Sequence, residues 1–147
     1  MVFTAAEIAY LAERSLGRLA TIGPGGAPQV QPVAFWTNAD TGTIDVGGPA
    51  LTRSQKFRNV QADPRVSFVV DDQSETPNPL GQTGRGVEVR GEVEIVVLDP
   101  PLLAVFAKET LRIHPRRIIT WNVEEFGSGS SERLPHLQGY SSRNISR

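Results

Sequence analysis

The clearest hydrophobic pattern in the chain is an alternation over residues 86–97, GVEVRGEVEIVV. Apolar residues and one glycine occupy every second position from Val87 to Ile95, and charged residues occupy the positions between them. A period of two places successive side chains on opposite faces of a strand. The segment therefore predicts a strand with one buried and one polar face.

A different period, typical of a helix, opens the chain. Ile8 and Leu11 lie on one apolar stripe, and Gly17 follows as a helix-ending glycine. Thr4 and Glu7 have the spacing of a capping box, in which each side chain accepts a hydrogen bond from the other residue's backbone. We therefore expect a helix that begins at Thr4 and ends before Gly17.

Five further segments have the composition of strands, and turn-forming clusters separate them. They are RLATIG, QVQPVAFWTN, TIDVGG, DPRVSFVVDD and RRIITWNVEE. Pro32 lies inside the second of them and cannot donate to a ladder, so that strand is expected at a sheet edge or a bulge.

Two short helices are expected between the strands. One begins at Thr52, three residues before Gln55 in another capping-box spacing, and ends at or before Pro64. The other begins at Asp99 with Pro100 in its first turn and continues through LLAVFAKETL. Six strands with these helices predict an antiparallel α+β domain, and closure into a barrel would remove its sheet edges.

Length and composition narrow the possible functions. The 147 residues suit one domain, expected over residues 1–126, with a polar Gly/Ser-rich tail at 127–147 that is disordered or wraps the domain. With 15 Lys+Arg against 16 Asp+Glu, no attraction to nucleic acid or an anionic membrane is expected. The absence of cysteine excludes thiolate catalysis and cysteine-based metal sites, and the two histidines are far apart, so no metal is expected. Without an apolar spanning run or a signal peptide, we expect a cytoplasmic protein.

The segment LTRSQKFRN carries the strongest candidate chemistry. Arg53 and Lys56 fall in the first turn of the expected helix, where each cation opposes the helix dipole by about 0.3–1 kcal/mol. A bound phosphate would reverse the sign of that term and use the unpaired backbone N–H groups. The alternative is a solvated helix face that happens to carry basic residues.

Five segments in this order resemble the pyridoxamine 5′-phosphate oxidase-like split-barrel family, and most closely its branch that uses the deazaflavin coenzyme F-420. They are GRLATIGPGGAPQVQPVAFW, TIDVGG, TRSQKFRN, ADPRVSFVVDD and GVEVRGEVEIV. The resemblance covers about residues 4–125. It implies a six-stranded split barrel that forms a homodimer, with two flavin-type sites at the dimer interface.

The resemblance also implies which residues bind the cofactor. The phosphate site maps onto Ser54 and Lys56, with Arg53 beside them. Many members that use flavin mononucleotide (FMN) have an arginine where this chain has Gln55, so one charge of that site is missing here. Backbone groups along the second strand bind the edge of the ring, and the glycines at the end of the third strand allow close approach of the ligand. These positions are Gln31, Pro32 and Val33, and Val46, Gly47 and Gly48.

On this resemblance the protein is an oxidoreductase that transfers a hydride between bound coenzyme F-420 and a small unsaturated or carbonyl-type organic substrate. No catalytic side chain can be assigned, and the proton donor is His114, Tyr140 or solvent. The candidate basic residues for binding the anionic tail of coenzyme F-420 are Arg90, Arg116 and Arg117. A local ion pair is the simpler role for Arg90, and ordinary surface charge is the alternative for Arg116 and Arg117. An FMN-dependent oxidase or reductase of the same fold is one alternative. A non-catalytic flavin- or tetrapyrrole-binding protein, with His114 or His136 as haem ligand, is another.

Overall fold

The structure, a computed structural model, describes residues 1–124 and 139–146. Over these residues the chain forms two α-helices, two 3₁₀ turns and seven strands. In chain order they are α1 (Ala5–Ala12), β1 (Leu16–Ile22), η1 (Pro24–Gly26), β2 (Pro28–Asn38), β3 (Thr43–Gly47), η2 (Leu51–Arg53), α2 (Gln55–Ala62), β4 (Arg65–Gln73), β5 (Gly84–Val97), β6 (Glu109–Trp121) and β7 (Tyr140–Asn144).

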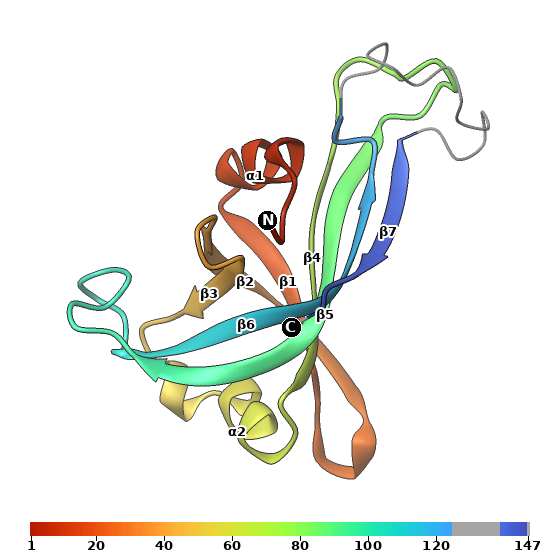
Figure 1. Ribbon diagram of the computed structural model, residues 1–147. Coiled ribbons are helices and arrows are strands. Elements are labelled where there is room, and N and C mark those ends of the chain that lie inside the picture. The colour runs from red at the N-terminus through yellow and green to blue at the C-terminus, as the bar shows by residue number, and fades with distance from the viewer. Residues whose placement is uncertain (125–138, 147) are drawn as a thin grey trace.

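The strands form one antiparallel sheet that closes on itself. Its order is β3-β2-β1-β4-β5-β6-β7, and a further pairing of β3 with β6 closes the first six strands into a barrel. In Figure 1, the long strands β5 and β6 curve from the upright part of the sheet beside β4 to the part beside β3. The predicted six-stranded split barrel is therefore confirmed, with β7 as an extra strand beside β6.

Alternate side chains of the strands fill the barrel. Val87 and Val89 of β5 are fully buried, as the alternation predicts. Phe35 and Phe68 meet edge to face in the core, with their ring centroids 5.3 Å apart. Ile95 is 36% exposed because β5 has passed the end of β4 there and pairs with β6 alone.

Strand β2 has a strand on both sides over only part of its length. It pairs with β1 along Pro28–Ala34, but β3 pairs with it only from Ala34 to Asn38. Pro32 lies in the part with a strand partner on one side, which confirms the predicted edge position.

The helix predicted after Asp99 is wrong. Residues 98–108 connect β5 to β6 without a helix, and β6 begins at Glu109, seven residues before the strand predicted from RRIITWNVEE. Pro101 directly follows Pro100, and a residue that precedes proline avoids the helical region. Residues 109–113, which were expected to lie in or next to that helix, pair in register with β5 instead.

Gly17 does not end the first helix. Helix α1 stops at Ala12 with Glu13 as its C-cap, and Gly17 lies inside β1. A side chain at Gly17 would overlap the ring of Phe68, because its Cβ would collide with the ring atoms Cζ and Cε2. The glycine is therefore needed for packing in the barrel.

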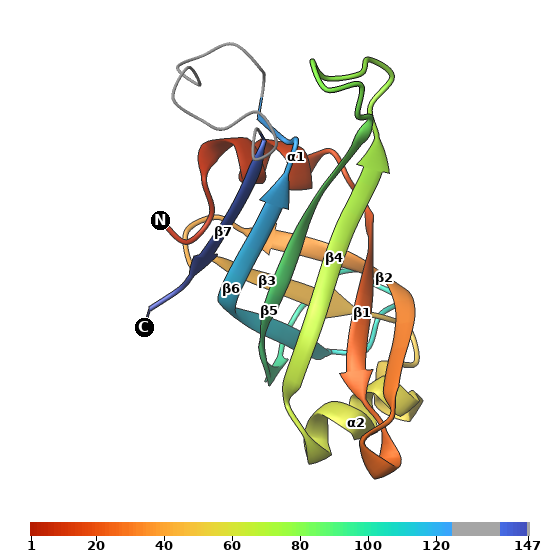
Figure 2. The same cartoon turned by 90° about the vertical axis from the view of Figure 1, so that its right-hand side faces the viewer.

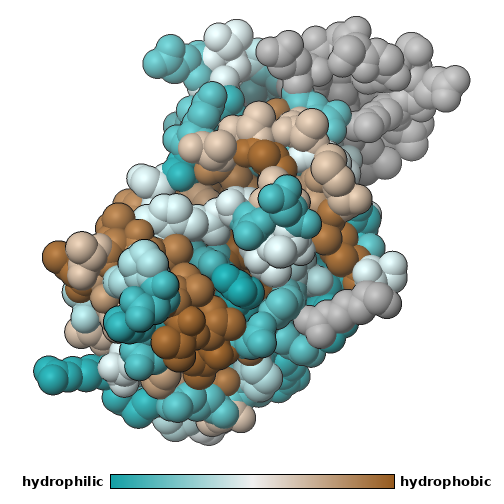
Figure 3. Space-filling model, turned by 60° about the vertical axis from the view of Figure 1, so that its left-hand side comes forward, coloured by the Kyte–Doolittle hydropathy of each residue, from teal (hydrophilic) through white to brown (hydrophobic). Residues whose placement is uncertain are grey.

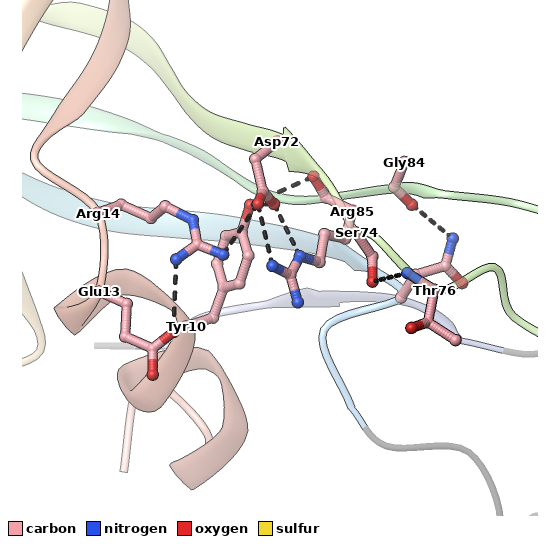
Figure 4. Close-up of polar contacts among 9 residues, drawn as sticks. Tyr10, Glu13, Arg14, Asp72, Ser74, Thr76, Gly84 and Arg85 are labelled. Carbon is pink, nitrogen blue, oxygen red and sulfur yellow. Dashed lines mark hydrogen bonds and ion pairs between the residues drawn. The ribbon is translucent and has the colours of Figure 1, made fainter.

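A polar cluster around Asp72 attaches α1 to the barrel (Figure 4). The Asp72 carboxylate accepts hydrogen bonds from the Tyr10 hydroxyl at 2.7 Å and from Arg14 at 3.0 Å. Arg85 donates to the same carboxylate at 2.8 and 3.0 Å. The Arg85 hydrogen bonds outweigh burial and hold the pKa of Asp72 well below its usual range, while burial and the bond to Asp72 raise the pKa of Tyr10 to about 12. At neutral pH the carboxylate therefore stays charged and the phenol stays neutral.

A buried ion pair joins α1 to β7. Glu7 is 1% exposed, and Arg143 donates to its two carboxylate oxygens at 2.6 and 2.9 Å. Thr4 and Glu7 also form the predicted capping box. Burial alone would raise the pKa of Glu7, but hydrogen bonds from Arg143, Thr120 and the Thr4 backbone outweigh it and lower that pKa.

Strand β7 belongs to the segment expected as a polar tail. It pairs with β6 from Tyr140↔Trp121 to Asn144↔Arg117. The expected domain boundary at residue 126 and residues 127–138 of that tail lie outside the described residues. Within residues 1–124 and 139–146, no helix has both the length and the apolar character needed to cross a bilayer.

We expect Arg143→Met to lower the free energy of unfolding by about 3 kcal/mol at pH 7, because it leaves the buried Glu7 carboxylate without its cation. Since the folded-state pKa of Glu7 is lowered, its contribution is present above the unfolded value and is lost as pH falls through the folded value. Without Arg143, burial would raise that pKa, so the variant should approach wild type in stability at pH 4. Thermal unfolding at both pH values measures this.

Arg18→Met is the matched control. Its ion pair with Asp71 spans 3.4 Å between side chains that are 46% and 53% exposed, so we expect a change of less than about 1 kcal/mol. Equal effects of the two substitutions would contradict the role assigned to Arg143.

Candidate functional site

The basic segment forms a helix that begins two residues later than predicted. The N-cap of α2 is Ser54, whose hydroxyl accepts from the Phe57 N–H at 3.2 Å and donates to the Leu51 carbonyl at 2.6 Å. Thr52 lies in the separate turn η2. The predicted Thr52 cap is therefore wrong because the chain bends at Ser54, which is extended with φ −80° and ψ 154°.

The later start changes which groups lie at the helix N-terminus. Lys56 is now the second residue of α2, and Arg53 lies outside the helix. The backbone N–H groups of Gln55 and Lys56 have no hydrogen-bond partner among the described residues. The N-terminus of α2 thus combines two unpaired backbone donors with the positive end of the helix dipole and a lysine side chain.

A cavity of about 320 Å³ opens beside this helix start. It is lined by residues of α2 and of the β1–β2 hairpin. These two elements lie at the end of the barrel opposite α1 (Figures 1 and 2). The cavity wall combines two apolar residues with hydroxyl, amide and ammonium groups. The lining residues are Leu19, Thr21, Gln29, Val30, Gln31, Gln55 and Lys56.

The structure brings together two residues that are 25 positions apart and were both assigned to the cofactor site. Lys56 Nζ donates to the Gln31 side-chain oxygen at 3.1 Å. Gln31 and Pro32 belong to the stretch of β2 that β3 does not reach, so one backbone edge there has no strand partner among the described residues. An open strand edge offers N–H and C=O groups to a planar ligand, and the lysine stands at the same place.

Sequence reasoning missed the residue behind the cavity, Asn59. This side chain is 3% exposed and lies on the inner face of α2. Its amide nitrogen donates to Thr21 Oγ1 at 2.9 Å and to Gln29 Oε1 at 2.8 Å. Its oxygen accepts from Gln55 Nε2 at 2.8 Å. The sequence feature that could have identified Asn59 is its position between Phe57 and Val60, which both face the core.

The guanidinium group of Arg58 also lies close to the start of α2. Arg58 donates to the Arg53 carbonyl at 3.0 Å and to Gln55 Oε1 at 2.8 Å. Gln55 is therefore bonded at both ends of its amide, to Arg58 and Asn59. Gln55 stands where many FMN-using members have an arginine. Near that position, Arg58 and Lys56 supply positive charge in this chain.

The other residues assigned to the cofactor site have mixed surroundings. The side chains of Val33 and Val46 are buried in the core, so only their backbones can reach a ligand. Gly47 is covered by its own chain, because a Cβ there would lie 2.9 Å from Phe106 Cδ2. At Gly48 no atom of the described residues lies within 4 Å of the Cβ position.

The groups considered for proton donation or for the coenzyme tail do not line the cavity. His114 lies within β6, where its Nε2 is 2.9 Å from Glu94, and Tyr140 lies in β7. Arg90 pairs with Glu88 at 2.6 Å, which confirms the local ion pair. Arg116 is 3.3 Å from Glu92, and Arg117 bonds Asn144 at 2.6 Å.

A family model described as pyridoxamine 5′-phosphate oxidase matches residues 3–128. The chain belongs to this family. The resemblance noted from the sequence is therefore confirmed, and the split barrel described above is the framework on which the cavity is built.

A relative of known activity and several solved structures are similar to this chain. A 5a,11a-dehydrotetracycline/5a,11a-dehydrooxytetracycline reductase of Streptomyces rimosus is 42% identical over 125 residues, which cover 84% of this chain and 86% of the relative. A conserved hypothetical protein of Mycobacterium tuberculosis matches with a TM-score of 0.64 and 27% identity over 89% of this chain and 95% of its own. A structure titled F420 reductase matches with a TM-score of 0.52 and 27% identity over 75% of this chain and 90% of its own.

The two neighbouring glycines should respond differently to alanine. We expect Gly47→Ala to lower the free energy of unfolding by about 1–2 kcal/mol, because the Phe106 ring must move. Gly48→Ala should change it by less than about 0.5 kcal/mol, because the site is open and the backbone is not in a left-handed conformation. Urea unfolding of both variants measures the difference. Equal losses of unfolding free energy would show that contact with Phe106 is not the reason for a glycine at position 47.

Proposed function

We propose that this protein is an oxidoreductase that binds coenzyme F-420 in the cavity between α2 and the β1–β2 hairpin. The observation that carries the proposal is the position of Lys56 at the mouth of that cavity, beside two unpaired helix N–H groups and the open edge of β2. A helix start with a lysine can hold a phosphate, and the free N–H and C=O groups of a strand edge can bond the polar rim of a planar ring.

The residues present fit such a ligand. Lys56 and the N–H groups of Gln55 and Lys56 supply donors for the phosphate. Leu19 and Val30 supply apolar wall, and the backbone of Gln31 to Val33 supplies groups for the ring edge. Arg53 and Ser54 lie next to the phosphate position, although the Ser54 hydroxyl already caps the helix.

The proposed reaction is reduction of an unsaturated or carbonyl-type bond in an organic substrate. The bound deazaflavin supplies the hydride chemistry, and the chain binds it, orients it and shields one side of it from water. Support comes from two relatives named as reductases, one of a dehydrotetracycline at 42% identity and one of F420 at 27%. FMN is the alternative cofactor for the same cavity.

We further propose that the protein forms a homodimer with the cofactor sites at the interface. Val30 lines the cavity and is 64% exposed, so the cavity mouth carries apolar surface that a second copy would cover. Other apolar side chains are exposed on the β5–β6 connection, where Val105 is 73% exposed. Figure 3 brings forward the side of the molecule with that connection, and apolar side chains gather there in several clusters.

The proposed cofactor site is tested with Lys56→Ala. Removing the ammonium group should raise the Kd for coenzyme F-420 by about tenfold or more, because a charge-assisted contact to phosphate is lost. The melting temperature without ligand should fall by less than about 2 °C, since the bond to Gln31 is exposed. Fluorescence titration with coenzyme F-420 and, separately, with FMN measures both affinities.

The chain's one other lysine provides a matched control. Lys108 pairs with Asp99 at 3.1 Å on the β5–β6 connection, away from the cavity lining, so Lys108→Ala should bind like wild type. Unchanged affinity in Lys56→Ala would remove the phosphate site. Preference for FMN would move the protein to the FMN-dependent alternative. Binding without oxidation of reduced coenzyme F-420 by 5a,11a-dehydrooxytetracycline or simple enones would favour a non-catalytic binding protein.

The dimer proposal predicts twice the monomer mass of 16.0 kDa in solution. Light scattering after size-exclusion chromatography, repeated over a hundredfold range of protein concentration, measures it. A monomer at every concentration would contradict the proposal, and would leave the cavity exposed on one side.

A further inference from the structure

Asn59 is buried behind the cavity and contacts three of its lining residues. We propose that Asn59 is a positioning residue: it fixes the amides of Gln29 and Gln55 in the orientation in which the cavity accepts its anionic cofactor. The ligand in this statement rests on the proposed function, but the positioning itself rests on the contacts alone.

The hydrogen bonds of Asn59 determine which way round each neighbouring amide lies. A side-chain amide has two donors on nitrogen and an acceptor on oxygen. Asn59 donates to Thr21 and Gln29 and accepts from Gln55, at 2.8–2.9 Å. Gln29 must therefore present its oxygen to Asn59, and Gln55 must present its nitrogen.

The far end of the Gln55 amide is also held. Gln55 Oε1 accepts from Arg58 at 2.8 Å. Asn59 is thus one of two partners of the Gln55 amide and, within the described residues, the one side-chain partner of the Gln29 amide.

Burial makes this arrangement costly to disturb. Asn59 is 3% and Thr21 4% exposed, so a polar atom that loses its partner there has little access to water. Two of the three bonds also tie α2 to β1 and to β2, and these elements together enclose the cavity. Loss of Asn59 should therefore loosen the polar wall before it unfolds the barrel.

The test uses two substitutions of Asn59 and one control. Asn59→Leu keeps the approximate shape but removes every polar contact, so both glutamine amides should lose their order. Asn59→Asp keeps the acceptor for Gln55 but replaces the donor, so Gln29 should reverse and present its nitrogen instead. Gln61→Leu makes a similar change on the exposed face of the same helix and should resemble wild type.

Side-chain amide NMR of the full chain reads the orientation without any ligand. In Asn59→Leu, the NH₂ order parameters of Gln29 and Gln55 should fall toward that of Gln61 on the exposed face of α2. In Asn59→Asp, the Gln29 NH₂ group should gain protection from exchange while that of Gln55 is unchanged. Glutamines as ordered in Asn59→Leu as in wild type would overturn the proposal.

Titration with coenzyme F-420 and FMN then tests the consequence for binding. The Kd of the ligand that wild type binds should rise about tenfold in Asn59→Leu and stay unchanged in Gln61→Leu. Unchanged affinity of folded Asn59→Leu would overturn the link to the cofactor. Binding of neither ligand by wild type would refute the proposed function instead, and the NMR result would still decide whether Asn59 positions the two amides.

Discussion

The pairing of β3 with β6 is the contact on which the rest of the structure depends. It turns an open sheet into a barrel, and so encloses a core of alternate side chains from six strands. Because β3 has only five residues and β2 has eleven, the part of β2 before Ala34 has no strand partner on that side among the described residues. The short strand that closes the barrel therefore also leaves open the strand edge at which the candidate site lies.

Helix α2 completes that site because it belongs to the connection from β3 to β4. The connection from β3 to β4 crosses the open end of the barrel, and Ser54 begins the helix beside the exposed edge of β2. Phe57 and Val60 anchor one face of the helix to the core, and Asn59 between them bonds to β1 and β2. The N-terminus is thereby held in place with its donors and Lys56 toward the cavity. In the proposed function this helix start would hold the phosphate of the cofactor, and the cofactor would supply the hydride chemistry.

The errors made from the sequence share one cause, which is competition between local and tertiary preferences. Thr52 and Ser54 are both good N-caps, and local spacing favoured Thr52, but the bend after η2 selected Ser54. Residues 99–111 have helix-forming composition, yet pairing with the end of β5 and packing of Phe106 on Gly47 kept them out of a helix. Gly17 matched a helix end and serves instead as space for the Phe68 ring.

The sequence by itself determined the elements whose signal is local and repeated. These are the alternating strand at 86–97, the capped first helix, the order of six strands and a basic segment with the chemistry of an anion site. Only the tertiary structure decided which of those basic groups meet the strand edge and which buried amide orients the cavity wall. The reason is physical: a hydrogen bond between residues 25 to 38 positions apart, such as Lys56–Gln31 or Asn59–Thr21, leaves no periodic trace in the sequence. It exists only once closure of the barrel has brought the elements together.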